Sequence, residues 1–127
     1  MIGKITSVED LEVYRKLCDL AIEIHDSTLL FPKFELYELG SQLRRSSNSA
    51  PANLAEGFNN KHTNIYLEGI SRAQSEIRET IHHLKIAFRK DYLPEEKLHR
   101  FLREYDACGR MLTNLEKSLK RTKTNRI

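Results

Sequence analysis

The stretch from Leu36 to Phe58, LYELGSQLRRSSNSAPANLAEGF, decides the fold of this chain. Apolar or small side chains recur along it at helical spacing, which predicts a helix with one face against a core. They are Leu36, Leu39, Leu43, Ser47, Ala50, Leu54 and Phe58. Pro51 interrupts the pattern, because a proline inside a helix removes a backbone donor and crowds the carbonyl four residues back. The stretch therefore predicts one helix kinked at Pro51, with two shorter helices as the alternative.

Three other segments show the same periodicity. The first begins near Ser7, which resembles a capping box with Asp10, and the last begins at Pro94, a favourable first helical residue. Short connections favour antiparallel neighbours, and no segment alternates with the two-residue period of a strand. We therefore predict an all-α fold, an antiparallel up-and-down four-helix bundle. It forms a single domain over 1–127, with a basic C-terminal tail at about 117–127. The expected core positions are Leu11, Tyr14, Cys18, Ala21 and Ile24 in the first helix, with Leu17 and Leu20 widening that stripe, Tyr66, Ile70, Ala73, Ile77, Ile81, Leu84 and Phe88 in the third, and Leu98, Phe101, Tyr105, Cys108, Leu112, Leu115 and Leu119 in the fourth.

The composition is that of a globular, charge-rich chain, with 39% hydrophobic and 31% charged residues. The sequence has neither a long apolar run nor an apolar segment near its N-terminus. We therefore expect no membrane span and no secretory signal, and hence a cytoplasmic protein. Two cysteines are too few for a disulfide framework, so Cys18 and Cys108 are expected to be buried, reduced thiols.

Positive charge gathers at the C-terminal end. After Glu116 come Lys117, Lys120, Arg121, Lys123 and Arg126, with no acid among them. Such a tail suits contact with nucleic acid, and it equally suits a solubilising helix end. Binding of RNA would be mostly electrostatic and would weaken with salt, because aromatic residues are not interleaved with the cations. The candidates for nucleic-acid binding are Arg44, Arg45, Lys85, Arg89, Lys90, Lys117, Lys120, Arg121, Lys123 and Arg126.

Motifs for catalysis or metal binding are absent from the sequence. The five histidines lack the spacing of a helical metal site, and no phosphate-binding glycine loop or nucleophile-elbow motif occurs. The serines around Pro51 have no histidine near them in sequence that would activate a nucleophile. We therefore predict that the chain is not an enzyme and needs no cofactor or metal.

A polar strip accompanies the second helix. Arg45 and Glu56 are eleven residues apart, about three turns, so they lie on nearly the same face. The strip suits a buried polar network, an intersubunit contact or a phosphate site, and a structural or assembly role is favoured because matched charges usually pair. Its structural or assembly candidates are Arg45, Asn48, Pro51, Asn53 and Glu56. Arg44 lies about 100° round the helix from Arg45 and is expected to be the more exposed arginine.

The segment from Phe31 to Phe58 carries a resemblance to a known family. It contains Phe31-Pro32, then Gln42-Leu43-Arg44-Arg45-Ser46, then the pattern P-x-N-x-A-E-G from Pro51 to Gly57. It resembles the signature of four-helix-bundle proteins encoded within intervening sequences of 23S ribosomal RNA in bacteria. One departure is the segment from Arg72 to Glu76, where the family tends to show Gly-Ser-x-x-Glu.

The resemblance implies an antiparallel bundle that assembles as a homopentamer. The resemblance also implies the fold of the accessory variability proteins of diversity-generating retroelements. Those similar pentamers bind a reverse transcriptase and its template RNA. The resulting hypothesis is a non-enzymatic, oligomeric, RNA-binding accessory factor, with a reverse transcriptase as a further partner. The alternative hypothesis is a protein-only assembly or interaction module encoded in an rRNA intervening sequence.

Overall fold

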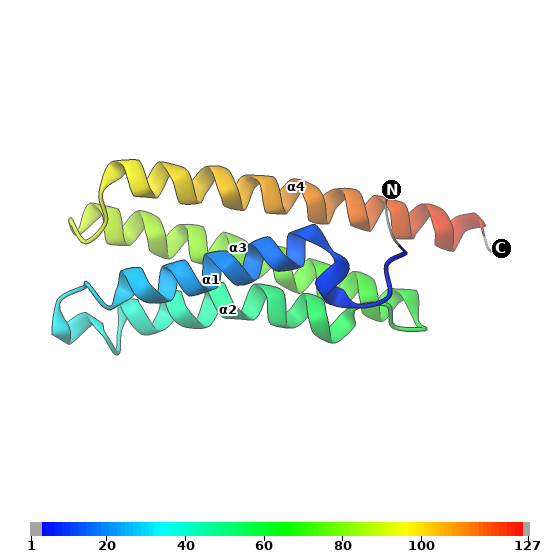
Figure 1. The fold of residues 1–127 in the computed structure, drawn as a ribbon, viewed down its shortest axis with the longest axis horizontal. Coiled ribbons are helices and arrows are strands. Elements are labelled where there is room, and N and C mark those ends of the chain that lie inside the picture. Colours follow the sequence, from blue (N-terminus) through cyan, green and yellow to red (C-terminus); the bar gives the residue numbers. More distant parts are fainter. Residues whose placement is uncertain (1–3, 126–127) are drawn as a thin grey trace.

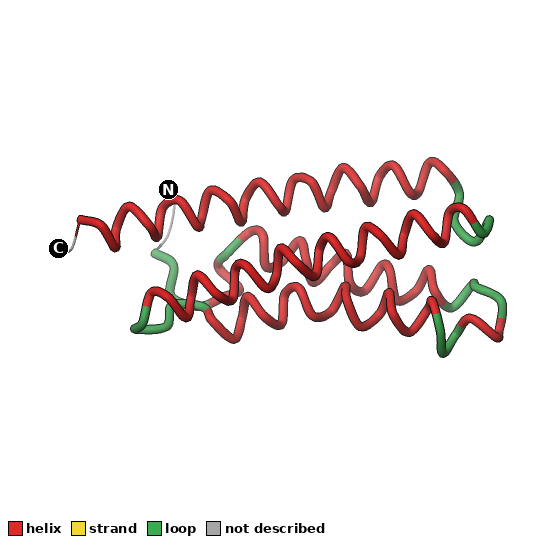
Figure 2. Tube along the Cα trace, turned by 180° about the vertical axis from the view of Figure 1, so that it is seen from behind, coloured by secondary structure: helices red, strands yellow, loops and turns green. Residues whose placement is uncertain are grey.

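The computed structural model describes residues 4–125, and over that range it is all-helical with no strand. Four long helices follow one another: α1 (Glu12–Thr28), α2 (Leu39–Gly57), α3 (Thr63–Arg89) and α4 (Glu95–Asn125). Two short 3-10 turns, η1 (Val8–Asp10) and η2 (Lys33–Glu35), precede α1 and α2. The connections α1–α2 and α3–α4 lie at one end of the molecule and α2–α3 at the other (Figure 1). Figure 2 shows the same helices from behind. The prediction of an all-α fold with four helices is confirmed.

The start of the first helix differs from the prediction. The Asp10 carboxylate accepts hydrogen bonds from the backbone N–H groups of Thr6 and Ser7, at 2.9 and 3.0 Å, as in a capping box. The turn it caps is only the 3-10 turn η1, because Leu11 is extended, with φ −79° and ψ 121°. The α-helix therefore begins at Glu12, and a start near Ser7 is wrong.

The core face of α1 is also rotated from the predicted one. Val13, Leu17, Leu20 and Ile24 are buried together with Leu11. Three of the expected positions, Tyr14, Cys18 and Ala21, are only half-buried. The apolar residues of α1 lie on more than one side of the helix, so helical spacing alone allows more than one core face. The neighbouring helices cover the side that carries Leu17 and Leu20.

Helix α2 runs without a break through Pro51, so the alternative of two shorter helices is wrong. Its buried positions include Leu39, Leu43, Ser47, Ala50 and Leu54, as the ladder predicted. Leu36 precedes the helix and is half-buried. Residues at the middle of the buried face are small, which lets α3 approach closely. The kink at Pro51 stays a prediction.

Helices α3 and α4 supply the rest of the core. Ile70, Ala73 and Leu84 of α3 are buried at 4% exposure or less, and Phe101 and Leu112 of α4 are wholly buried. Complete burial of a large apolar side chain stabilises the fold by about 1.5–3 kcal/mol. The fully buried large residues of these two ladders therefore contribute to the stability of the fold.

The two cysteines differ in environment. Cys108 is wholly buried, and burial raises the pKa of its thiol to about 11, so it packs as a small hydrophobic group. Cys18 is half-buried, so the expectation of two buried thiols is correct only for Cys108.

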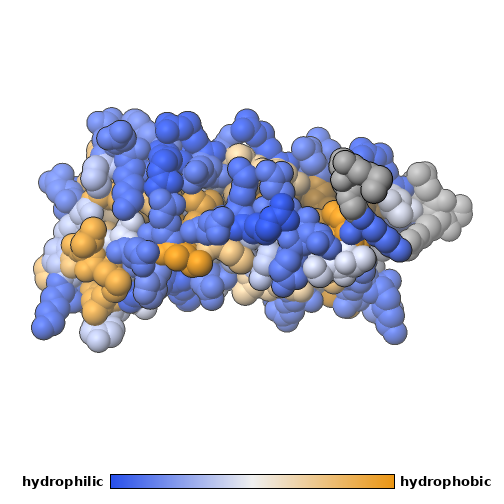
Figure 3. Space-filling model, viewed as in Figure 1, coloured by the Kyte–Doolittle hydropathy of each residue, from blue (hydrophilic) through white to orange (hydrophobic). Residues whose placement is uncertain are grey.

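The molecular surface is mostly hydrophilic in the view of Figure 3, with apolar residues concentrated at the end where α1 and α2 are joined. Within residues 4–125, no helix combines the length and apolar character needed to cross a bilayer.

Candidate functional site

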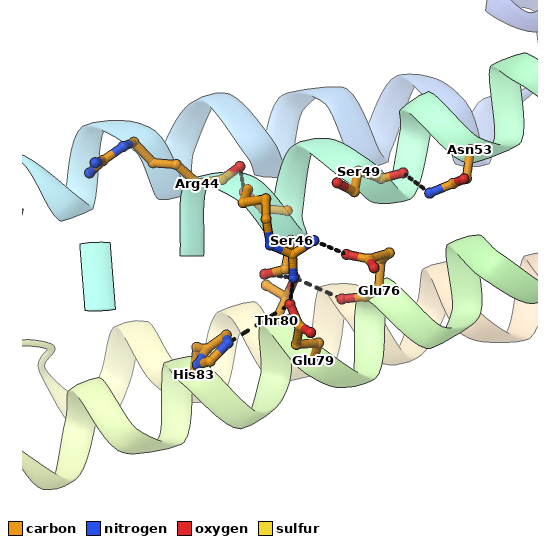
Figure 4. A network of polar contacts seen from close by, with 10 residues as sticks. Arg44, Ser46, Ser49, Asn53, Glu76, Glu79, Thr80 and His83 are labelled. Atoms are coloured by element: carbon orange, nitrogen blue, oxygen red, sulfur yellow. Dashed lines mark hydrogen bonds and ion pairs between the residues drawn. The ribbon is translucent and has the colours of Figure 1, made fainter. Parts of the chain in front are cut away.

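A polar cluster joins the middle of α2 to α3 (Figure 4). Arg45 Nη1 lies 3.3 Å from Glu76 Oε2, and the same guanidinium pairs with Glu79. His83 Nε2 lies 3.9 Å from Glu79 Oε2. The pKa of His83 is lowered, mainly by burial and to a smaller extent by the positive charges of His82 and Arg45. Arg45 therefore takes its acids from α3 and not from Glu56, which was its expected partner on α2.

A buried pair of hydroxyls lies beside this cluster. Thr80 and Ser46 share a hydrogen bond of 2.8 Å, and both residues are wholly buried. The Thr80 hydroxyl is also 2.8 Å from the backbone carbonyl of Glu76. These contacts satisfy the two buried hydroxyls at the interface between α2 and α3, where an unpaired hydroxyl would be costly.

Arg44 is directed toward its own chain. Its Nη1 donates to Thr28 Oγ1 at 2.9 Å and its Nη2 donates to the Leu36 carbonyl at 2.5 Å. The side chain thus ties the start of α2 to the end of α1. The expectation that Arg44 is the more exposed arginine is wrong, because Arg44 is half-buried while Arg45 is exposed.

Two glycines meet where α2 and α3 cross. A Cβ atom added to Gly69 would lie 2.8 Å from the Asn53 carbonyl oxygen and 3.2 Å from Gly57 Cα. A Cβ added to Gly57 would lie 2.9 Å from the Ile65 carbonyl oxygen. Only glycine permits this backbone approach. The sequence analysis missed Gly69, although an isolated glycine inside a helical pattern is a signal of close packing.

A small pocket of about 140 Å³ lies next to this crossing. Asn53 and Glu56 from α2 line it, with Glu68 and Arg72 from α3. Asn53 Nδ2 donates to the Ser49 carbonyl at 2.8 Å, and Arg72 pairs with Glu68 at 2.6 Å. Among the described residues Glu56 has no hydrogen-bond or ion-pair partner. The P-x-N-x-A-E-G segment thus contributes a backbone contact and one side of a pocket.

A family model described as 23S rRNA-intervening sequence protein matches residues 9–114. The chain belongs to this family. The match spans α1, α2, α3 and α4 as far as Asn114, so it includes the Arg45 cluster and the glycine crossing. Comparison with curated proteins returned no match. The cations from Lys117 onward lie outside the region matched to the 23S rRNA-intervening sequence proteins.

These cations form an exposed group at the end of α4, which we call the basic arm. It comprises Lys117, Lys120, Arg121 and Lys123. Lys120 pairs with Glu116 at 3.7 Å, and Lys123 bonds to Asn64 at the start of α3. Figure 1 shows that this end of α4 extends beyond the α2–α3 connection. Arg126, the last of the predicted cations, lies outside the described residues.

The remaining basic candidates lie near the end of α3. Lys85 and Arg89 are exposed and one turn apart. Lys90 is engaged within the chain, because its Nζ lies 2.8 Å from Glu35 Oε2. Glu35 is 1% exposed and also accepts a hydrogen bond from the Tyr92 hydroxyl at 3.0 Å. The hydrogen bond from Lys90 lowers the pKa of the Glu35 carboxyl group. Through Lys90 and Tyr92, this carboxylate joins the α1–α2 connection to the α3–α4 connection.

Five large apolar side chains are exposed near the α1–α2 connection, and we call them the apolar patch. They are Ile22, Leu29, Leu30, Phe34 and Tyr37, and the exposed fraction reaches 83% at Leu30 and 84% at Tyr37. Clustered exposed apolar residues mark interaction surfaces. The sequence analysis missed this surface. The run of apolar residues in a loop was the available signal.

Another pocket, between α1 and α2, places Asn48 beside Arg44 and Cys18. Asn48 is exposed there. Among residues 4–125, no three His, Cys, Asp or Glu side chains come together as metal ligands. That the chain is not an enzyme and uses no cofactor stays a prediction.

Proposed function

We propose that this family member is a non-enzymatic, cytoplasmic, oligomeric adaptor that binds RNA through its basic arm. The basic arm carries the proposal, because four cations within seven residues are exposed on a helix end that extends from the bundle. Exposed lysines and arginines bind phosphates and release counterions when they do so. Lys90 is held by the buried carboxylate of Glu35 and Arg45 by two acids, which makes those cations weaker candidates.

Binding of labelled structured RNA, measured by fluorescence anisotropy at low salt, tests this function. The arm variant has Lys117, Lys120, Arg121 and Lys123 changed to Gln. The control variant has four other exposed cations changed to Gln, namely Lys16, Lys33, Lys61 and Arg103. We expect the arm variant to lose about tenfold or more in affinity, and the control variant to lose much less. Absence of binding by the wild-type protein at low salt would refute the proposal.

The oligomer in this proposal is held together by the apolar patch. Leu30, Phe34 and Tyr37 are at least 69% exposed, and covering them with a second copy of the chain would remove this apolar area from water. The resemblance to pentameric relatives supports five copies. Light scattering should give an oligomer for the wild-type chain and a smaller species for a Leu30→Ser, Phe34→Ser variant. An Ile5→Ser control should leave the mass unchanged, and a strictly monomeric wild-type chain would contradict this part.

The apolar patch also favours a second candidate function, a protein-only assembly module. In that case the oligomer forms and no RNA binds at any salt concentration. A reverse transcriptase is a further partner supported by the resemblance alone, and co-purification of the two proteins, with the Leu30→Ser, Phe34→Ser variant as control, would test it.

We also infer that the bundle is antiparallel and up-and-down, and that α2 bends at Pro51. Connections that alternate between the two ends support the first statement, and the backbone donor missing at Pro51 supports the second. An experimental structure with a straight α2 axis across Pro51 would contradict the bend.

A further inference from the structure

A groove of about 650 Å³ runs between α3 and α4, on a part of the molecule that the basic arm adjoins. Ile77 and Ile81 from α3 and Tyr105 and Gly109 from α4 line it. A Cβ atom added to Gly109 would meet no atom within 4 Å, so packing does not require glycine there. Glycine within a helix costs stability relative to alanine. Because Gly109 has no side chain, the groove stays open beside the apolar side chains of Ile77 and Ile81.

Tyr105 contributes a buried polar group to the groove. Its side chain is wholly buried, and its hydroxyl has no hydrogen-bond partner among the described residues. Burial raises the pKa of Tyr105, so the hydroxyl keeps its proton and can donate it in a hydrogen bond. A buried hydroxyl without a partner is unfavourable, so Tyr105 is held in place by the packing of its ring and not by its hydroxyl.

The rim of the groove combines amide and hydroxyl groups with cations. Gln74 Nε2 donates to Thr113 Oγ1 at 3.3 Å, and these groups offer the donor and acceptor atoms that the edge of a base requires. Arg78 and Lys117 are exposed on the same rim and have no ion-pair partner among the described residues. Arg110 is paired with Asp106 at 3.2 Å, so it is less available.

We propose that this groove binds one unpaired nucleotide of an RNA strand. The base lies against Ile77 and Ile81 in the space beside Gly109, and its polar edge faces Gln74 and Thr113. The adjoining phosphate lies between Arg78 and Lys117. A free phosphate would leave the apolar wall unused, and a base-paired nucleotide would present its polar edge to its partner strand. The inference rests on the proposed RNA binding and extends it, because Lys117 belongs to both the basic arm and the groove.

The decisive variant is Gly109→Leu, which fills the groove and places a better helix former in α4. The matched control is Ser118→Leu, nine residues further along, on the opposite face of the same helix. Probes are an eight-nucleotide single-stranded RNA, an RNA duplex of equal length, AMP and inorganic phosphate. Thermal unfolding followed by circular dichroism verifies that each variant is folded.

We expect Gly109→Leu to weaken single-stranded RNA binding about tenfold or more, because the leucine takes the place of the base against the apolar wall, while duplex binding changes little. Ser118→Leu should leave both unchanged. AMP, but not inorganic phosphate, should shift the NMR signals of Gly109 and Tyr105. Equal effects of Gly109→Leu on single strand and duplex, or no effect on either, would overturn the groove assignment and leave RNA binding by the basic arm intact. Shifts of the same size with phosphate alone would overturn the assignment of a nucleotide. If the wild-type protein bound no RNA, the proposed function would fail, and AMP would then show whether the groove takes a free nucleotide.

Discussion

The same substitution, glycine to alanine, should have opposite effects on stability at two helical positions. At Gly69 the new Cβ would lie 2.8 Å from the Asn53 carbonyl oxygen and 3.2 Å from Gly57 Cα. Both neighbours are backbone atoms of α2, which cannot rotate away as a flexible side chain would. Overpacking of this kind costs about 1–3 kcal/mol, and removing a helical glycine returns about 0.5–1 kcal/mol. Gly69→Ala should therefore lower the free energy of unfolding by about 1–2 kcal/mol.

At Gly109 only the favourable contribution remains, because the new Cβ meets no atom within 4 Å. Gly109→Ala should therefore raise the free energy of unfolding by about 0.5–1 kcal/mol. Urea unfolding followed by circular dichroism measures both variants, at one fixed protomer concentration, because assembly adds to apparent stability. If both variants were more stable than the wild-type protein, the close approach of α2 and α3 at Gly57 and Gly69 would be refuted.

Three further outcomes follow from other contacts. Thr80→Val should destabilise the fold by about 1–3 kcal/mol, because it leaves the Ser46 hydroxyl without its partner. Adding Ser46→Ala should recover part of this loss. Equal stability of the single and double variants in urea would contradict the pairing. The pKa of Glu35 is lowered in the folded state, so its contribution is complete above the ordinary carboxyl pKa of about 4.3 and is lost as pH falls through the folded value. Glu35→Gln should thus flatten the acid limb of the stability–pH curve, and an unchanged limb would count against the buried ion pair. A thiol reagent at pH 8 should label the half-buried Cys18 quickly. It should label Cys108, which is buried and has a pKa of about 11, only when the protein unfolds. Rapid labelling of both thiols in the folded protein would be inconsistent with the burial of Cys108.

The sequence predicts the parts of this fold that depend on local periodicity. The ladder of α2 is correct from Leu39 to Leu54, because Leu43, Ala50 and Leu54 have no competing stripe on that helix, whereas its two ends, Leu36 and Phe58, lie outside the helix and are half-buried. Most core positions of α3 and α4 follow for the same reason, although Ile81, Phe88, Leu115 and Leu119 are only half-buried. The face of α1 was predicted less well, since leucines and isoleucines occur on more than one side and tertiary contacts select between them. Its start was missed because a capping box identifies a turn and not the length of the helix that follows.

The candidate site depends on contacts between residues far apart in the sequence, and these could not be predicted. Arg45 was recognised as a residue that needs an acid, but its acids lie on α3, 31 residues away in the case of Glu76. The partners of Glu35 are 55 and 57 residues away. Periodicity places a side chain on a face and does not identify which element covers that face.

The salt dependence of RNA binding tests the central claim most directly. The slope of log K against log salt concentration reports the number of phosphates contacted, at about 0.7–0.9 per contact. With Lys117, Lys120, Arg121 and Lys123 changed to Gln, the slope should become shallower by about 3, while the matched control variant keeps the wild-type slope. Identical slopes for the wild-type protein and the arm variant would contradict an RNA interface at the basic arm.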